Sequence, residues 1–195
     1  MSREGTSVAP VAEDMEIHPQ GTAVDAPLPG SNKRRRPRAG SRRARTLTRF
    51  VRDVVIVGAT GAISSAIAAA VCGRAEHGHA LRPLNAVSHI WSDSAPPRDE
   101  GPGARNLWIG VGLHFGASLF WATFFEAVFG RAARSSPAKA LGSGAAISAV
   151  AYVTDYHIVD ERFRPGYEAH LSGRSLAAIY CALAIGYAVA ARATR

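Results

Sequence analysis

His114 and Asp155 are the two side chains of this sequence best placed to do chemistry, because both are ionisable and both lie in long apolar stretches. A charged side chain at the centre of a membrane helix costs about 2.5–3.5 kcal/mol, so such a residue is a functional candidate by default. If the two stretches are membrane helices, both residues belong to the same half of the bilayer and could form a carboxylate–imidazole pair. Two interpretations stay open: a structural hydrogen bond between helices, which we favour, and a ligand or proton site.

Polar neighbours at helical spacing extend this candidate site. With about 100° of rotation per residue, Asp155 shares one helix stripe with Ser148 and Tyr152, and Ser118 shares a face with His114. Glu126 lies elsewhere, near the end of its stretch, where we expect it to pair with Arg131 or Arg134. The candidate ligand or proton site therefore comprises His114, Ser118, Ser148, Tyr152 and Asp155.

Other chemistry finds little support in the sequence. His89, His114, Asp155 and His157 are residue types that bind transition metals, but their spacing matches no metal-binding motif. No serine or cysteine lies in a context that would activate it as a nucleophile. We therefore predict no catalytic residue, no metal site and no cofactor, and favour a non-enzymatic protein.

One glycine motif suggests a different class of protein. The run from Asp53 to Ser64 resembles the opening of a nucleotide-binding βαβ unit, with Gly58 and Gly61 in place and Glu76 near the spacing of a ribose-binding acid. However, Ser64 replaces the third glycine, and no alternating strands and helices follow to build a parallel sheet. A nucleotide-binding oxidoreductase is therefore a remote alternative. In a membrane helix, the same glycines would indicate close contact between helices.

Four apolar stretches must position these residues, at about 54–72, 107–129, 140–158 and 174–191. A hydrocarbon core about 30 Å thick needs about 20 helical residues, with about 17 as the lower limit. All four stretches meet that length. We therefore predict an all-α, polytopic membrane protein in which residues 51–195 form a bundle of four transmembrane helices.

Residues 1–50 differ sharply from the rest, being polar and rich in proline and arginine, and we expect them to form a disordered cytoplasmic tail. Nucleic-acid binding is the usual interpretation of such a basic run. Because the run adjoins the first apolar stretch, we favour binding to anionic lipid headgroups, at roughly 1 kcal/mol per arginine. The predicted lipid-binding residues are Arg34, Arg35, Arg36, Arg38, Arg42, Arg43 and Arg45.

The distribution of basic residues predicts the orientation of the bundle. The basic tail, the short connection from Arg131 to Lys139 and the C-terminal Arg192 would all lie on the cytoplasmic side. The intervening segments 73–106 and 159–173 contain acids that balance their basic residues. We therefore expect both termini on the cytoplasmic side of a bacterial inner membrane.

Small residues recur at four-residue spacing in every apolar stretch, which predicts close helix packing in lipid. The same faces could instead bind a second copy of the chain or another membrane protein. The two cysteines, Cys72 and Cys181, are expected to be buried in helix contacts. The predicted packing residues are Ala62, Ala66, Ala70, Gly112, Gly116, Gly144, Ser148, Ala182, Gly186 and Ala190.

The two outer connections carry local signals. The segment 84–91 is partly apolar and could lie on the membrane surface, with Trp91 at headgroup depth. In the last connection, Pro165-Gly166 predicts a turn and Ser172 a helix N-cap. Glu168 and His170, which lie between the turn and the cap, could close over the His114–Asp155 face, but we favour a solvated turn.

The segments 85–91 and 155–172 resemble parts of small, uncharacterised bacterial four-helix inner-membrane proteins. The resemblance would cover about residues 50–192, and it implies a location and a helix number but no residue roles. Our leading interpretation is a non-enzymatic accessory or binding protein that engages lipid or a partner. The alternative is a component of small-solute or proton transport that uses His114 and Asp155.

Overall fold

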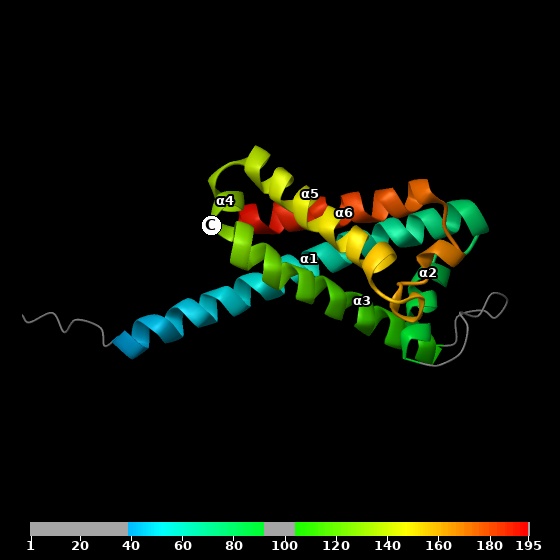
Figure 1. Ribbon diagram of the computed structural model, residues 1–195, viewed down its shortest axis with the longest axis horizontal. Coiled ribbons are helices and arrows are strands. Elements are labelled where there is room, and N and C mark those ends of the chain that lie inside the picture. Colours follow the sequence, from blue (N-terminus) through cyan, green and yellow to red (C-terminus); the bar gives the residue numbers. More distant parts are fainter. Residues whose placement is uncertain (1–38, 92–103, 195) are drawn as a thin grey trace, which may run out of the picture. The chain divides into compact units, whose positions relative to one another are not determined.

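The computed structural model describes the backbone of residues 39–91 and 104–194, and the side chains of residues 46–91 and 105–194. All regular structure in these residues is helical, which confirms the all-α prediction. The nucleotide-binding alternative loses its basis in the described part of the chain, because its expected strand at 53–57 lies inside a helix. The helices are α1 (Ala39–His77), α2 (Arg82–Ala86), α3 (Ala104–Phe124), α4 (Gly130–Ser135), α5 (Pro137–Val153) and α6 (Gly173–Ala193) (Figure 1).

Two π-helical segments lengthen these elements. Phe125–Phe129 joins α3 to α4, and Thr154–Ile158 continues α5. Between α4 and α5 the chain reverses at Ser136, whose side chain accepts a hydrogen bond from the Lys139 backbone amide and caps α5. Single 3-10 turns complete the connections at Val87–Ile90, Glu161–Phe163 and Tyr167–Ala169.

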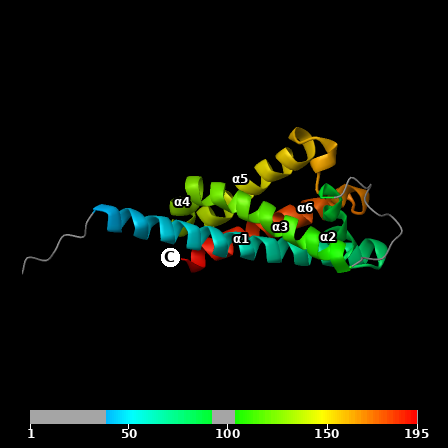
Figure 2. The ribbon, with the colours of Figure 1, turned by 90° about the horizontal axis from the view of Figure 1, so that it is seen from below.

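Four helical segments run between the same two ends of the bundle (Figures 1 and 2). α1 packs against both α3 and α6, and α5 packs against α6. At one end, here called the Arg134 end, the Arg134 side chain contacts Asp53 near the start of the apolar part of α1 and Thr194 after α6. At the other, the Glu76 end, Glu76 accepts hydrogen bonds from Ser172 before α6. The apolar part of α1 therefore begins at the same end of the bundle at which α6 ends.

Three of these segments are long and apolar enough to cross a membrane: Thr46–His77, Arg105–Ser135 and Gly173–Ala193. The fourth predicted span, at 140–158, is helical but is not among the three. The first helix starts earlier than expected. Because α1 begins at Ala39, residues 39–50 are helical, which corrects the tail boundary predicted at residue 50.

Close packing at glycines follows the prediction in part. A Cβ atom on Gly58 would lie 2.7 Å from Leu119 Cδ2, and one on Gly61 would overlap the Tyr187 ring, so α1 meets both α3 and α6 closely. Gly144 faces the Ala184 carbonyl in the same way. The prediction is wrong for Gly112 and Gly116, where a Cβ would meet open space. In α3 the close contact is made instead by Gly110, which lies against the Leu84 carbonyl.

Two apolar clusters form the core. One, around Phe125 and Tyr187, fills the half of the bundle nearer the Arg134 end, while the other gathers around Tyr167 and Ile179 near the Glu76 end. The segment 83–88 is buried against this second half, so it is not the surface segment that we expected. The prediction of buried thiols is also wrong for Cys181, which is exposed.

Candidate functional site

A cavity of about 430 Å³ opens between α3, α5 and α6 in the half of the bundle nearer the Glu76 end. Its lining is mainly apolar and aromatic, as is usual for small-molecule sites, and its volume lies within their common range of about 300–1,000 Å³. α1 contributes Ser65, and the loop before α6 contributes Phe163, Pro165 and Tyr167. The helices contribute, among others, Leu113, His114, Ser118, Phe120, Trp121, Asp155, Ile179, Tyr180 and Leu183.

His114 joins three parts of the chain. Its Nε2 atom lies 3.1 Å from the Ala62 carbonyl oxygen and 3.2 Å from Ser65 Oγ in α1. Its Nδ1 atom lies 3.0 Å from the Tyr167 hydroxyl of the loop before α6. α3 is therefore tied through one imidazole to α1 on one side and to the loop on the other.

The partners of His114 assign its tautomer. A carbonyl oxygen can only accept, so Nε2 carries the proton and donates to Ala62. The Ser65 hydroxyl, which donates to the Gly61 carbonyl, can accept from the same Nε2–H group. Nδ1 then accepts from the Tyr167 hydroxyl, which stays protonated because burial raises its pKa. Both ring nitrogens of a neutral imidazole are thus engaged by protein groups.

Asp155 lies in the π-helical segment that continues α5, and such widened turns are frequent at functional sites. The Tyr180 hydroxyl donates to its Oδ2 atom at 2.7 Å. Its Oδ1 atom accepts no hydrogen bond from the described residues, and the side chain borders the cavity. His114 and Asp155 therefore line one cavity, but each is bonded to other partners and the expected carboxylate–imidazole bond is not formed.

The remaining predicted site residues divide between two places. Ser118 borders the same cavity, but its hydroxyl donates to the Gly58 carbonyl at 2.8 Å and so serves the α1–α3 contact. Ser148 and Tyr152 border a separate, more open hollow of about 330 Å³ between α5 and α6. Ser148 donates to the Tyr180 carbonyl across that contact. The predicted five-residue site is thus split by the position of α6.

Ser65, Tyr167 and Tyr180 are polar residues of the cavity that sequence reasoning missed. The signal for Tyr167 was indirect: the turn at Gly166, where φ is +80°, directs the following tyrosine inward, and Tyr167 is 3% exposed. Glu168 and His170 were the residues that the sequence suggested could close over this face, as the alternative to a solvated turn. Tyr167 makes that contact instead, while Glu168 is exposed and His170 is buried.

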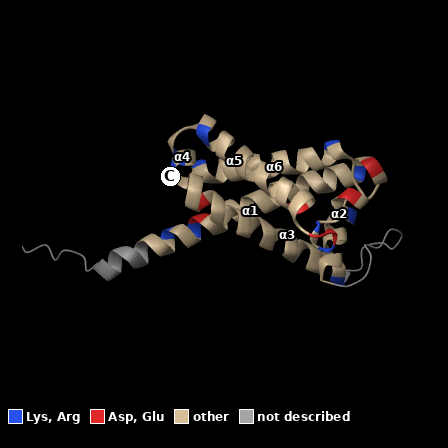
Figure 3. Ribbon diagram, in the orientation of Figure 1, with Lys and Arg blue, Asp and Glu red and all other residues tan. Residues whose placement is uncertain are grey.

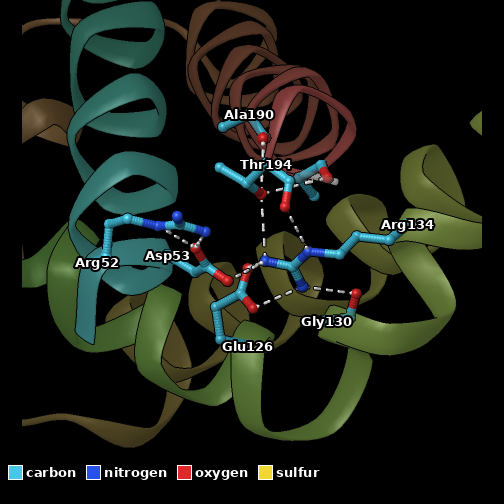
Figure 4. A network of polar contacts seen from close by, with 8 residues as sticks. Arg52, Asp53, Glu126, Gly130, Arg134, Ala190 and Thr194 are labelled. Carbon is cyan, nitrogen blue, oxygen red and sulfur yellow. Dashed lines mark hydrogen bonds and ion pairs between the residues drawn. The ribbon is translucent and has the colours of Figure 1, made fainter. Parts of the chain in front are cut away.

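A second polar network lies at the Arg134 end (Figure 4). The Arg134 guanidinium contacts Glu126 Oε2 at 2.8 Å and Asp53 Oδ2 at 2.9 Å, so Arg134 is the one of the two expected partners that pairs with Glu126. Arg134 also donates to the carbonyl and hydroxyl oxygens of Thr194, and Arg52 pairs with Asp53 at 2.7 Å. Two arginines therefore balance two carboxylates, and the network joins α1, α4, α6 and the π-helical segment after α3.

Other predicted contacts fall outside the structure. Arg34, Arg35, Arg36 and Arg38 lie outside the described residues, and so do the side chains of Arg42, Arg43 and Arg45. Their lipid binding stays a prediction. In the part of the chain that is described, no three His, Cys, Asp or Glu side chains gather as metal ligands would.

No protein-family model matches this chain, and no curated protein or solved structure is significantly similar to it. The resemblance drawn from the segments 85–91 and 155–172 therefore stays a prediction. The structure itself defines a class: a helical protein with three helices long and apolar enough to span a membrane.

Proposed function

We propose that this protein is a four-helix integral protein of a bacterial inner membrane that binds a small ligand, without chemical conversion, in the cavity between α3, α5 and α6. The single observation that carries the proposal is the cavity itself, which is largely apolar and bordered by one carboxylate. Both chain termini lie on the cytoplasmic side, together with the Arg134 end.

The outward surface of the helices supports a lipid environment. Large apolar side chains that are at least 45% exposed recur along α1, α3, α5 and α6, and a surface of this kind marks a membrane or partner contact. Among the described residues, the charged ones lie mostly toward the two ends of the bundle (Figure 3). The exposed residues include Val55, Ile63, Ile67, Val71, Phe120, Phe124, Val150, Val153, Ile185 and Val189.

The path of the chain supports a fourth crossing. α5 with its π-helical continuation covers residues 137–158, which at about 1.5 Å per residue is long enough for a hydrocarbon core of about 30 Å. It runs beside α6, with Gly144 opposite Ala184 and Ser148 opposite Tyr180. An even number of crossings also agrees with the contact that Arg134 makes to both Asp53 and Thr194.

Binding is favoured over catalysis because of how the polar groups of the cavity are used. His114 and Ser118 are held by other parts of the protein, so neither is an available base or nucleophile. Transport is the alternative, and Asp155 is the residue that favours it. A transported solute would, however, have to pass the packed cluster around Phe125 and Tyr187, both fully buried.

Trp121 offers a direct test, because it borders the cavity and the chain has only 3 tryptophans. In detergent-purified protein with Trp91→Phe and Trp108→Phe, iodobenzene should quench Trp121 fluorescence saturably. Gly116→Phe should abolish saturation by filling the cavity. Gly142→Phe, at another open glycine outside the cavity, should not. Quenching that rises linearly in the parent, or that survives Gly116→Phe, would overturn the cavity proposal.

A further inference from the structure

The cavity contains a single acidic residue. Among the described residues that border it, Asp155 is the one acid, and none is lysine or arginine. Arg164 lies between two lining residues in sequence, but its guanidinium faces Glu161, with 3.6 Å between Nη1 and Oε1. The charge character of the cavity is therefore set by one carboxylate.

The Asp155 carboxylate is only partly compensated by the protein. Tyr180 donates to its Oδ2 atom, Oδ1 accepts no hydrogen bond from the described residues, and Asp155 borders the cavity. His114 cannot supply the missing charge as it stands, because both of its ring nitrogens are engaged elsewhere. A carboxylate beside apolar surface is costly unless it is paired, and a cationic ligand in the cavity would provide that pairing.

The rest of the lining selects the kind of cation. Calcium and magnesium require about six to eight oxygen ligands, or a near-complete water shell, and this apolar lining provides neither. Aromatic rings from Phe120, Trp121 and Tyr180 instead border the cavity, and aromatic faces attract organic cations by cation–π interaction. Leu113, Ile179 and Leu183 add aliphatic surface suited to an apolar body.

We propose that the cavity binds a small organic cation with an apolar body, such as an alkyl- or arylammonium, and that Asp155 pairs with its positive charge. This inference rests on the proposed binding function and adds the chemical class of the ligand. Anionic solutes are disfavoured, because they would meet the like charge of the carboxylate and no lysine or arginine among the described lining residues. Neutral solutes of the same shape fit the cavity but leave Asp155 unpaired.

Two probes of nearly equal shape separate charge from fit: benzyltrimethylammonium and its neutral isostere neopentylbenzene. Each is titrated against iodobenzene quenching of Trp121 in the single-tryptophan protein. Benzyltrimethylammonium should displace iodobenzene at a concentration at least about tenfold lower than neopentylbenzene, because only the cation gains ion pairing with Asp155 and cation–π contacts. Asp155→Asn should remove this preference, and Asp155→Glu should retain it.

The outcomes distinguish this inference from the proposed function. The organic-cation site is overturned if the two probes displace iodobenzene equally from the parent protein, or if the cation does not displace it. Saturable quenching by iodobenzene would still support the cavity itself. An unchanged preference in folded Asp155→Asn overturns the role of Asp155. Because the parent comparison needs no substitution at Asp155, it decides the matter even if Asp155→Asn fails to fold.

Discussion

Arg134 Nη2 lies 2.9 Å from Asp53 Oδ2, across 81 residues of sequence. The same guanidinium pairs with Glu126, whose side chain is 4% exposed, and donates to Thr194 beyond α6. One side chain therefore holds together the start of the apolar part of α1, the end of the α3 segment and the end of α6 (Figure 4). This relationship fixes which helix ends meet.

Arg134→Ala should destabilise the protein strongly, because it leaves the buried Glu126 carboxylate without its partner. Removing one partner of a buried pair typically costs about 3–5 kcal/mol. Denaturant-induced unfolding in detergent, followed by circular dichroism, measures the change. Arg131→Ala is the matched control, since Arg131 is exposed in the same helix and should cost little. Equal stability of the two variants would contradict a structural role for the network.

Tyr167→Phe should destabilise the protein by about 1–3 kcal/mol, because Nδ1 of His114 loses its donor. In a double-mutant cycle with His114→Ala, the two positions should couple by about 0.5–3 kcal/mol, as residues in direct contact do. Tyr152→Phe is the control, because the contacts described for Tyr152 involve its ring. Additive effects of Tyr167→Phe and His114→Ala would show that the bond does not contribute.

Gly186→Ala should destabilise the bundle, because its new methyl group would overlap Ser64 Oγ and lie 2.9 Å from Gly61 Cα. Overpacking of this kind typically costs about 1–3 kcal/mol. Gly112→Ala should be neutral or slightly stabilising, since a Cβ there meets open space and alanine is the better helix former. The comparison uses unfolding in detergent. If Gly112→Ala destabilised the protein while Gly186→Ala was tolerated, the close helix contact would lie at Gly112 and not at Gly186, which would contradict this packing.

Cysteines introduced at positions 135 and 161 should react with a maleimide from opposite sides of the membrane if α5 crosses it. Both are exposed, at the two ends of the segment that contains α5. In a protein with Cys72→Ser and Cys181→Ser, Glu161→Cys should react with an impermeant maleimide in intact spheroplasts. Ser135→Cys should react only after the membrane is opened. If both cysteines reacted from the same side, α5 would not cross the membrane. Only α1, α3 and α6 would then remain as crossings.

Local features of the sequence were sufficient for the helical class and for several boundaries. The apolar stretches became helices, the turn at Pro165-Gly166 formed with Gly166 at positive φ, and Ser172 capped α6. That Glu126 pairs with a nearby arginine also followed from the sequence, because Glu126, Arg131 and Arg134 lie near one helix end, but the choice of Arg134 did not. These features depend on neighbours in sequence, which a pattern of residue types records directly.

Tertiary packing decided everything that depends on which helix lies opposite which. A helical wheel gives the angle between His114 and Ser118, but not that α1 supplies their partners Ala62 and Gly58. It grouped Ser148 and Tyr152 with Asp155, whereas the position of α6 places them beside a different hollow. Rotation about a helix axis is set by shape complementarity and hydrogen bonds to distant segments, so no single stretch of sequence contains it.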